Sequence, residues 1–177
     1  MAMKNIFFIL IIVFFSGCIP KVQSEKMILD TVAYKQLTKD SINVFIYGDE
    51  GVYFPGNGIL INNVKILDKK EILDAVLKSI QKSAMFGPIE NNSTYKLDVF
   101  IIKALNIKSS DILTWEISLE MAWNLSKDNK TIWRKTITSL GKNKTFIGYD
   151  RVEGAYNDAV KNNIDKALSQ ISELNLK

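Results

Sequence analysis

The sequence predicts one α+β domain, an antiparallel sheet of about four strands with two amphipathic helices packed on one face. Four runs are rich in β-branched and aromatic residues, and three of these follow one another across short turns. Two further segments carry apolar residues at helical spacing. The chain of 177 residues is long enough to bury a core. We expect this single domain to span residues 42–177.

The amino-terminal segment carries ten apolar residues, Ile6 to Phe15, after a single positive charge at Lys4. A transmembrane helix needs about 20 apolar residues, and Pro20 discourages continuation of a helix. A positive start, a short apolar run and small residues before a break are typical of a secretory signal. Residues 1–17 are therefore expected to be a signal peptide, the alternatives being a plain signal anchor or a buried strand.

The apolar run ends in Phe15, Ser16, Gly17 and Cys18, the last being the one cysteine of the chain. These residues resemble the lipobox of bacterial lipoproteins, although Phe15 replaces the usual leucine. The resemblance implies that a diacylglyceryl group is attached to the Cys18 thiol and that signal peptidase II cuts before this residue. It also implies acylation of the new amino terminus, and two or three acyl chains anchor a protein durably where one would not.

The position after the cysteine is occupied by Ile19. In the enterobacterial lipoproteins that the motif resembles, an aspartate there favours retention in the inner membrane. The resemblance therefore implies the periplasmic face of the outer membrane, with the outer leaflet of the inner membrane and a Gram-positive cell membrane as alternatives. Residues 18–41 are expected to be the lipidated cysteine and a tether. Because the helical periodicity is weak, a flexible spacer with one docked turn is favoured over the alternative of a full helix.

The first strand is expected at residues 42–47, which are β-branched and aromatic and end at Gly48. The glycine- and proline-rich stretch that follows is expected to be a loop or an irregular hairpin. It carries Tyr53 and Phe54. Two interpretations stay open for these aromatic side chains, which either cover the core or bind a partner.

The first helix is expected from Asp68, whose carboxylate can cap it, with Glu71 three residues on completing a pair that resembles a capping box. Gly87 and Pro88 are expected to end this segment. Its apolar stripe consists of Ile72, Leu73, Val76, Leu77 and Ile80.

Three strands are expected at residues 94–107, 112–125 and 131–140, joined as an antiparallel meander with one face exposed to water. The first of them turns apolar on both faces, which favours a central position. The second alternates cleanly, and its predicted buried face consists of Trp115, Ile117, Leu119, Met121 and Trp123. The last helix is expected from Arg151 after a loop. Ala155 and Ala159 give it a small-residue surface that can approach a sheet closely.

Residues 94–172 resemble a group of small bacterial lipoproteins of unknown function, the YajG type. The shared stretches are "YKLDVFI", "TIWRKTI" and "VEGAYNDAVKNNIDKAL". Similar layouts of strands and helices occur in lipoproteins that activate cell-wall synthases and in auxiliary lipoproteins of lipid transporters. The resemblance implies the fold rather than a particular activity.

The residue types argue against catalysis. The chain has no histidine, the commonest general base and zinc ligand, and its single cysteine allows no cysteine cluster. Glu116 and Glu120 share a strand face but lie roughly 13 Å apart, beyond the about 5–9.5 Å of paired glycosidase carboxylates. Asp49 is not followed by the ligand spacing of a calcium loop. We therefore expect no enzymatic activity, no metal and no cofactor.

The formal net charge of +4 is too mild to indicate nucleic-acid binding. A basic rim that faces acidic lipid, lipopolysaccharide or glycan is one interpretation of the basic residues near the last strand. The alternative is a mixed surface with neighbouring acids. The basic residues concerned are Arg134, Lys135, Lys142, Lys144 and Arg151.

These observations together predict a lipid-anchored cell-envelope protein, a non-catalytic interaction or accessory module of an envelope complex. Its expected partners are the membrane, through the lipids on Cys18, and an envelope protein. The alternative is a lipid-binding or transport-auxiliary lipoprotein, which would require an apolar cavity between the helices and the sheet.

Overall fold

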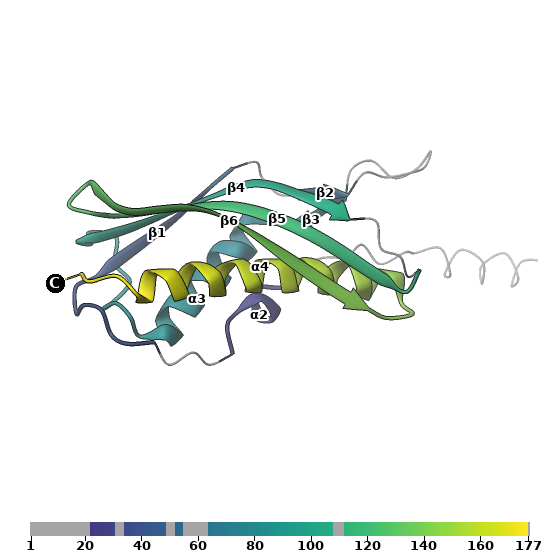
Figure 1. The fold of residues 1–177 in the computed structure, drawn as a ribbon, viewed down its shortest axis with the longest axis horizontal. Helices are drawn as coiled ribbons and strands as arrows, with labels where there is room; N and C mark the ends of the chain where they lie inside the picture. The colour runs from purple at the N-terminus through teal and green to yellow at the C-terminus, as the bar shows by residue number, and fades with distance from the viewer. Residues whose placement is uncertain (1–21, 31–33, 49–51, 55–63, 108–111, 177) are drawn as a thin grey trace, which may run out of the picture.

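A computed structural model describes residues 22–30, 34–48, 52–54, 64–107 and 112–176 (Figure 1). Four strands form one sheet, two short strands pair antiparallel with each other, and the helices lie on one side of the sheet (Figure 1). In chain order the elements are α2 (Ser24–Met27), β1 (Ile42–Tyr47), β2 (Val52–Phe54), β3 (Val64–Leu67), α3 (Lys69–Ser83), β4 (Tyr95–Ile107), β5 (Thr114–Lys127), β6 (Lys130–Lys144) and α4 (Gly148–Ser172).

The four-stranded sheet has the order β1-β4-β5-β6 and is mixed. The antiparallel meander of β4, β5 and β6 is confirmed. The expectation of a purely antiparallel sheet is wrong, because β1 pairs parallel to β4, with Ile42 opposite Tyr95. The chain between β1 and β4 contains α3, so it crosses one face of the sheet and re-enters in the same direction.

The core lies between the sheet and its helices, with α3 against β1 and α4 against β5 and β6. Alternation along β5 points one set of side chains into this layer. Ile117, Leu119, Met121 and Trp123 are fully buried, as the sequence predicts, while Trp115 is half-buried near the end of the strand.

Helix α3 begins as expected, because the Asp68 carboxylate accepts a hydrogen bond from the Lys70 N–H at 3.0 Å. It ends earlier than expected, at Ser83, with Ala84 in the left-handed conformation at φ 52°. The chain leaves the helix there because the next two side chains, Met85 and Phe86, enter the core.

Strand β6 runs to Lys144 and α4 starts at Gly148, so the loop predicted between them is reduced to three residues. Gly141 explains the longer strand, because α4 lies directly on it. A Cβ at this position would stand 2.0 Å from the Ala155 carbonyl oxygen and 2.7 Å from the Ala159 Cβ. The predicted small-residue surface of the last helix therefore meets the sheet at Gly141.

Residues 18–41 are described from Val22 onward, except for 31–33. A single helical turn, α2, lies at Ser24–Met27, before the weak helical pattern of the following residues, and it contacts both α3 and α4. Val22, Met27 and Leu29 are buried in the core. The chain is therefore held on the helical layer well before β1 begins.

Candidate functional site

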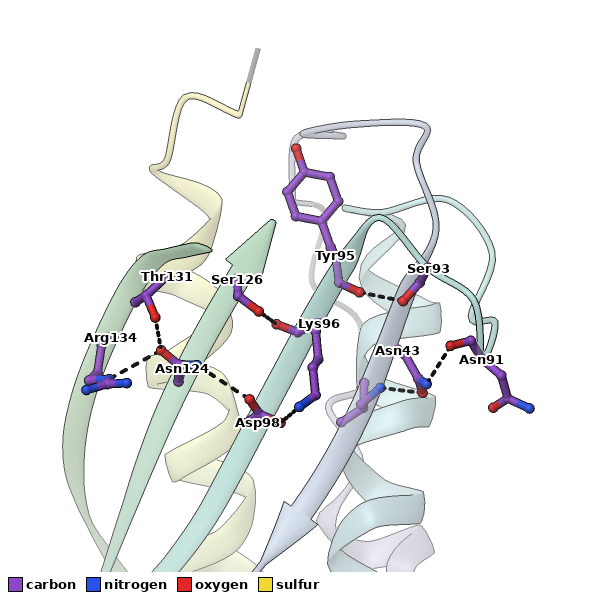
Figure 2. Close-up of polar contacts among 11 residues, drawn as sticks. Asn43, Asn91, Ser93, Tyr95, Lys96, Asp98, Asn124, Ser126, Thr131 and Arg134 are labelled. Atoms are coloured by element: carbon purple, nitrogen blue, oxygen red, sulfur yellow. Dashed lines mark hydrogen bonds and ion pairs between the residues drawn. The ribbon is translucent and has the colours of Figure 1, made fainter. Parts of the chain in front are cut away.

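The sheet face opposite the helices is not covered by any of the described elements (Figure 1). We call it the open face. Because paired residues share a face, the strand register carries one row across the sheet from Asp98 on β4 through Asn124 on β5 to Arg134 on β6. Figure 2 shows these side chains side by side, with Lys96 next to Asp98 and Asn43 on β1. We call this set the polar row.

Hydrogen bonds and one ion pair hold the polar row in place (Figure 2). The Lys96 ammonium lies 2.9 Å from the Asp98 carboxylate, and this contact raises the pKa of Lys96. The amide of Asn124 donates to the other oxygen of Asp98 at 3.4 Å. The Asn124 carbonyl oxygen accepts bonds from Arg134 at 3.2 Å and from Thr131 at 3.0 Å. The row is therefore a pre-organised set of polar groups in which Lys96 and Asp98 neutralise each other and Arg134 adds one positive charge.

Three aromatic side chains lie beside the polar row on the open face: Phe45 and Tyr47 of β1 and Phe100 of β4. The ring centroids of Tyr47 and Phe100 are 4.8 Å apart, and those of Phe45 and Tyr47 are 6.5 Å apart. The ammonium of Lys96 lies 4.8 Å from the Phe45 centroid, a cation–π contact. These side chains remain 38–41% exposed. We call them the aromatic cluster.

A depression of about 490 Å³ adjoins one end of the polar row. Asn43 forms part of its wall and donates a hydrogen bond to the Asn91 carbonyl at 3.2 Å. The wall consists mostly of amide, hydroxyl and charged groups, which suit a polar ligand or a peptide better than an acyl chain. The residues that line it are Asn43, Phe45, Asn91, Asn92, Ser93, Thr94, Lys96, Asp128 and Asn129.

The residues of the predicted lipobox, Phe15, Ser16, Gly17 and Cys18, lie outside the described part of the chain. Their roles stay predictions. Tyr53 and Phe54 belong to β2, within the stretch expected to be a loop or an irregular hairpin. Their side chains are not among those described, so a role in binding also stays a prediction.

The predicted basic residues occupy different ends of β6. Lys142 and Lys144 lie together near its end, whereas Arg134 belongs to the polar row eight residues earlier, roughly 26 Å away at the rise of a strand. Lys142 pairs with Glu116 at 2.7 Å, and its backbone N–H donates to the Asp158 carboxylate at 3.0 Å. Acidic groups thus adjoin this end of the strand.

Each of the two glutamates considered for catalysis forms an ion pair with a lysine. Glu116 pairs with Lys142 at 2.7 Å and Glu120 pairs with Lys103 at 3.0 Å. Within the described residues there is no group of three or more histidine, cysteine, aspartate or glutamate side chains that could hold a metal ion. Asp49 lies outside the described part of the chain.

The sequence interpretation missed the aromatic cluster, because apolar runs in β1 and β4 indicate strands covered on both faces. One signal was present. Phe45 and Tyr47 stand two residues apart and therefore share a face, while Val44 takes the other. The pairing of β1 with β4, which puts Tyr47 opposite Phe100, could not be read from either strand alone.

No family model matches the chain, and no curated protein matches it in sequence. The fold is shared with solved structures. Protein XCC0632 from Xanthomonas campestris, of family DUF330, has a TM-score of 0.62 and 12% identity, over 86% of this chain and 94% of that one. The hypothetical protein CT253 from Chlamydia trachomatis has a TM-score of 0.55 and 8% identity, over 76% and 96%.

A minor lipoprotein from Acinetobacter baumannii also has this fold, with a TM-score of 0.50 and 12% identity, over 77% of this chain and 92% of that one. Likeness at these identities shows the fold alone, and the presence of a lipoprotein among the proteins that share it is consistent with a lipoprotein. Of the helices that the structure describes, none has the length and apolar character that a membrane span requires.

Proposed function

We propose that this protein is a lipid-anchored component of the bacterial cell envelope that binds another envelope protein without catalysing a reaction. The lipids on Cys18 hold it on the periplasmic face of the outer membrane. The open face of the sheet provides the binding surface. The observation that carries this proposal is the exposed aromatic cluster beside the polar row.

The aromatic cluster has the properties of the centre of a protein interface. Aromatic side chains bury a large area on binding and lose little conformational entropy, since they have only two side-chain torsions. Tyr47 and Phe100 are already stacked, so less ordering is required when a partner binds. The polar row beside them supplies directional hydrogen bonds that distinguish the correct partner from others.

The anchor is tested by the mass of the protein purified from cell membranes. We expect wild-type protein that begins at Cys18 and carries acyl chains, and that fractionates with the outer membrane. The variant Cys18→Ser should lack the acyl chains. Wild-type protein with a free Cys18 thiol, or with residues 1–17 still attached, would show that the anchor is absent.

The binding surface is tested by a photo-crosslinking amino acid placed at Phe100, with Gln81 on exposed α3 as the matched control position. We expect one discrete adduct from position 100 in intact cells and none from position 81. In the purified complex, Tyr47→Ser should weaken binding by about 10-fold or more, as loss of an aromatic anchor does. Equal crosslinking from both positions, or unchanged affinity of Tyr47→Ser, would count against the open face.

A further inference from the structure

Three large apolar side chains lie exposed at one end of the molecule. Ile112 precedes β5 and is 89% exposed, while Phe146 and Ile147 lie between β6 and α4 and are 86% and 58% exposed. We call these three residues the apolar tip. The two loops form one surface, because the Thr145 N–H donates to the Leu113 carbonyl at 3.2 Å and the Arg151 guanidinium donates to the Ile112 carbonyl.

The stability of α4 does not account for these residue types. Ile147 occupies the N-cap position. Isoleucine is among the poorest residues there, and its side chain forms no capping hydrogen bond. Helix α3 in the same chain has a capping aspartate, Asp68. Places where a sequence departs from a local rule without a structural gain are often functional. The apolar tip is such a place.

Residues 22–30 and Tyr34 form the amino-terminal segment of the domain, which begins near the first turns of α3 and α4. Its contacts advance along α4 in step with the sequence. Lys26 pairs with Glu153 at 2.7 Å, Asp30 pairs with Lys161 at 2.5 Å, and Tyr34 donates to Asp165 at 3.1 Å. The Ser24 N–H donates to Glu71 in the first turn of α3 at 2.9 Å. Residues 22–30 and Tyr34 therefore run beside α4 in the same direction, so Val22 belongs to the end of the domain where α4 begins.

The distance between anchor and domain is short. Val22 is buried in the core, and only three residues separate it from Cys18. Four residue steps span at most about 14 Å when fully extended. The headgroup region of one leaflet is about 5–8 Å thick. A domain held on so short a segment stays against the membrane, with the end at which α4 begins nearest to it.

We propose that the apolar tip inserts into the bilayer interface beside the lipidated cysteine and fixes the orientation of the domain. This inference rests on the proposed function, because it takes Cys18 as the anchor. Strands β5 and β6 extend between the tip at one end and the turn at Asp128 and Asn129 at the other. This turn forms part of the wall of the polar depression. With the tip in the membrane, that depression faces away from the lipid and stays accessible to a partner.

Charge contributes little to this contact. Lys142 is paired with Glu116, and the other charges near the tip have both signs: Lys144 and Arg151 are positive, and Asp150 and Asp158 are negative. A surface of mixed sign produces no strong field toward anionic lipid. Insertion should therefore depend on the apolar side chains and hardly at all on the anionic lipid content of the membrane.

The test uses the processed, membrane-extracted protein with a nitroxide spin label on one introduced cysteine, reconstituted in phosphatidylcholine vesicles. The label sites are Phe146→Cys and Ile112→Cys at the tip, and Lys130→Cys at the exposed far end of β6 as the control. All three positions are exposed, so the substitutions should leave the unfolding temperature unchanged. Accessibility of each label to oxygen and to a water-soluble nickel complex reports its depth.

We expect the ratio of oxygen to nickel accessibility to be several-fold higher at positions 146 and 112 than at position 130. The same ratio is expected when phosphatidylglycerol is included in the vesicles. Water-like values at the tip would overturn the inference. Low accessibility to both reagents would also overturn it, because that result indicates contact with protein, either a second copy or a partner.

The same samples separate the two proposals. A lipidated Cys18 thiol cannot react, so each variant should carry one nitroxide by mass. Two nitroxides together with a tip inside the bilayer would overturn the lipid anchor alone. One nitroxide together with a tip in water would overturn the orientation alone.

Discussion

At the scale of single residues, Asn163 decides how the longest helix meets the sheet. It is fully buried on α4, and its carbonyl oxygen accepts a hydrogen bond from the Trp123 indole N–H at 2.9 Å. Its amide donates to the Ile137 carbonyl at 2.9 Å and to the Ser139 hydroxyl at 3.1 Å. One side chain thus satisfies polar groups of β5 and β6 inside an otherwise apolar layer.

We expect Asn163→Ala to lower the free energy of unfolding by about 2–3 kcal/mol, because it leaves the Trp123 indole N–H without its acceptor in the core. The measurement is urea denaturation followed by Trp fluorescence. The control is Asn162→Ala. In the wild type the half-buried Asn162 side chain donates its amide to the Leu140 carbonyl at 2.8 Å. It should cost less than about 1 kcal/mol. Equal losses for the two variants would contradict the role of Asn163.

At the scale of elements, the contact between α4 and β6 depends on one missing side chain. Gly141 lies on β6 under the Ala155 carbonyl, and Ser139 two residues earlier donates to the Ala159 carbonyl at 2.7 Å. The helix axis can therefore approach the strand closely over Ala155 and Ala159. This approach places the start of α4, and with it the apolar tip, next to the end of β6.

Gly141→Ala should destabilise the protein by about 1–3 kcal/mol or more, because the added methyl group meets backbone atoms that cannot move independently. Gly148→Ala is the matched control. The Cβ added there meets only the end of the flexible Arg151 side chain, at 3.2 Å, and alanine is the better helix former, so a change of less than about 1 kcal/mol is expected. Thermal unfolding of both variants decides. A stable Gly141→Ala protein would show that α4 does not press on β6 at this point.

At the scale of the whole molecule, residues 22–30 connect the proposed anchor at Cys18 to the rest of the domain. Glu153 on α4 is nearly buried, with a side chain 6% exposed, and its partner Lys26 comes from α2. The Leu29 N–H donates to the Ser79 hydroxyl of α3 at 3.2 Å. The segment thus bridges α3 and α4.

We expect Lys26→Met to destabilise the protein by about 1–3 kcal/mol, because a buried carboxylate loses its charged hydrogen-bond partner. Limited proteolysis should then cut residues 22–30 faster than in the wild type. Lys103→Met is the control, since the largely exposed Lys103 pairs with Glu120 on the sheet and makes no ion pair with residues 22–30. Exposed pairs of this kind add little stability. Unchanged cleavage of Lys26→Met would indicate that the apolar contacts of the segment suffice.

Local pattern alone was sufficient to locate most elements. The strand at 42–47, the alternation from Ile117 to Trp123 and the cap at Asp68 each depend on neighbours a few residues away, so the sequence contains their cause. The end of β6 and the start of α4 differ from the predicted positions, because Gly141 and Ala155 pack against each other although they are distant in sequence. The capping residues and the apolar spacing within either element do not predict that contact.

By itself, the sequence determined the α+β class, the meander of β4, β5 and β6, and the face that Trp123 buries, because periodicity and short turns act locally. Only the tertiary structure decided that β1 runs parallel to β4 and that Phe45, Tyr47 and Phe100 gather on the open face. It also decided that Ile112 and Phe146 share one end. These groups consist of residues that are far apart in the chain. The energy of pairing between distant strands does not affect the periodicity of either strand, so the pattern within a strand does not predict its partner.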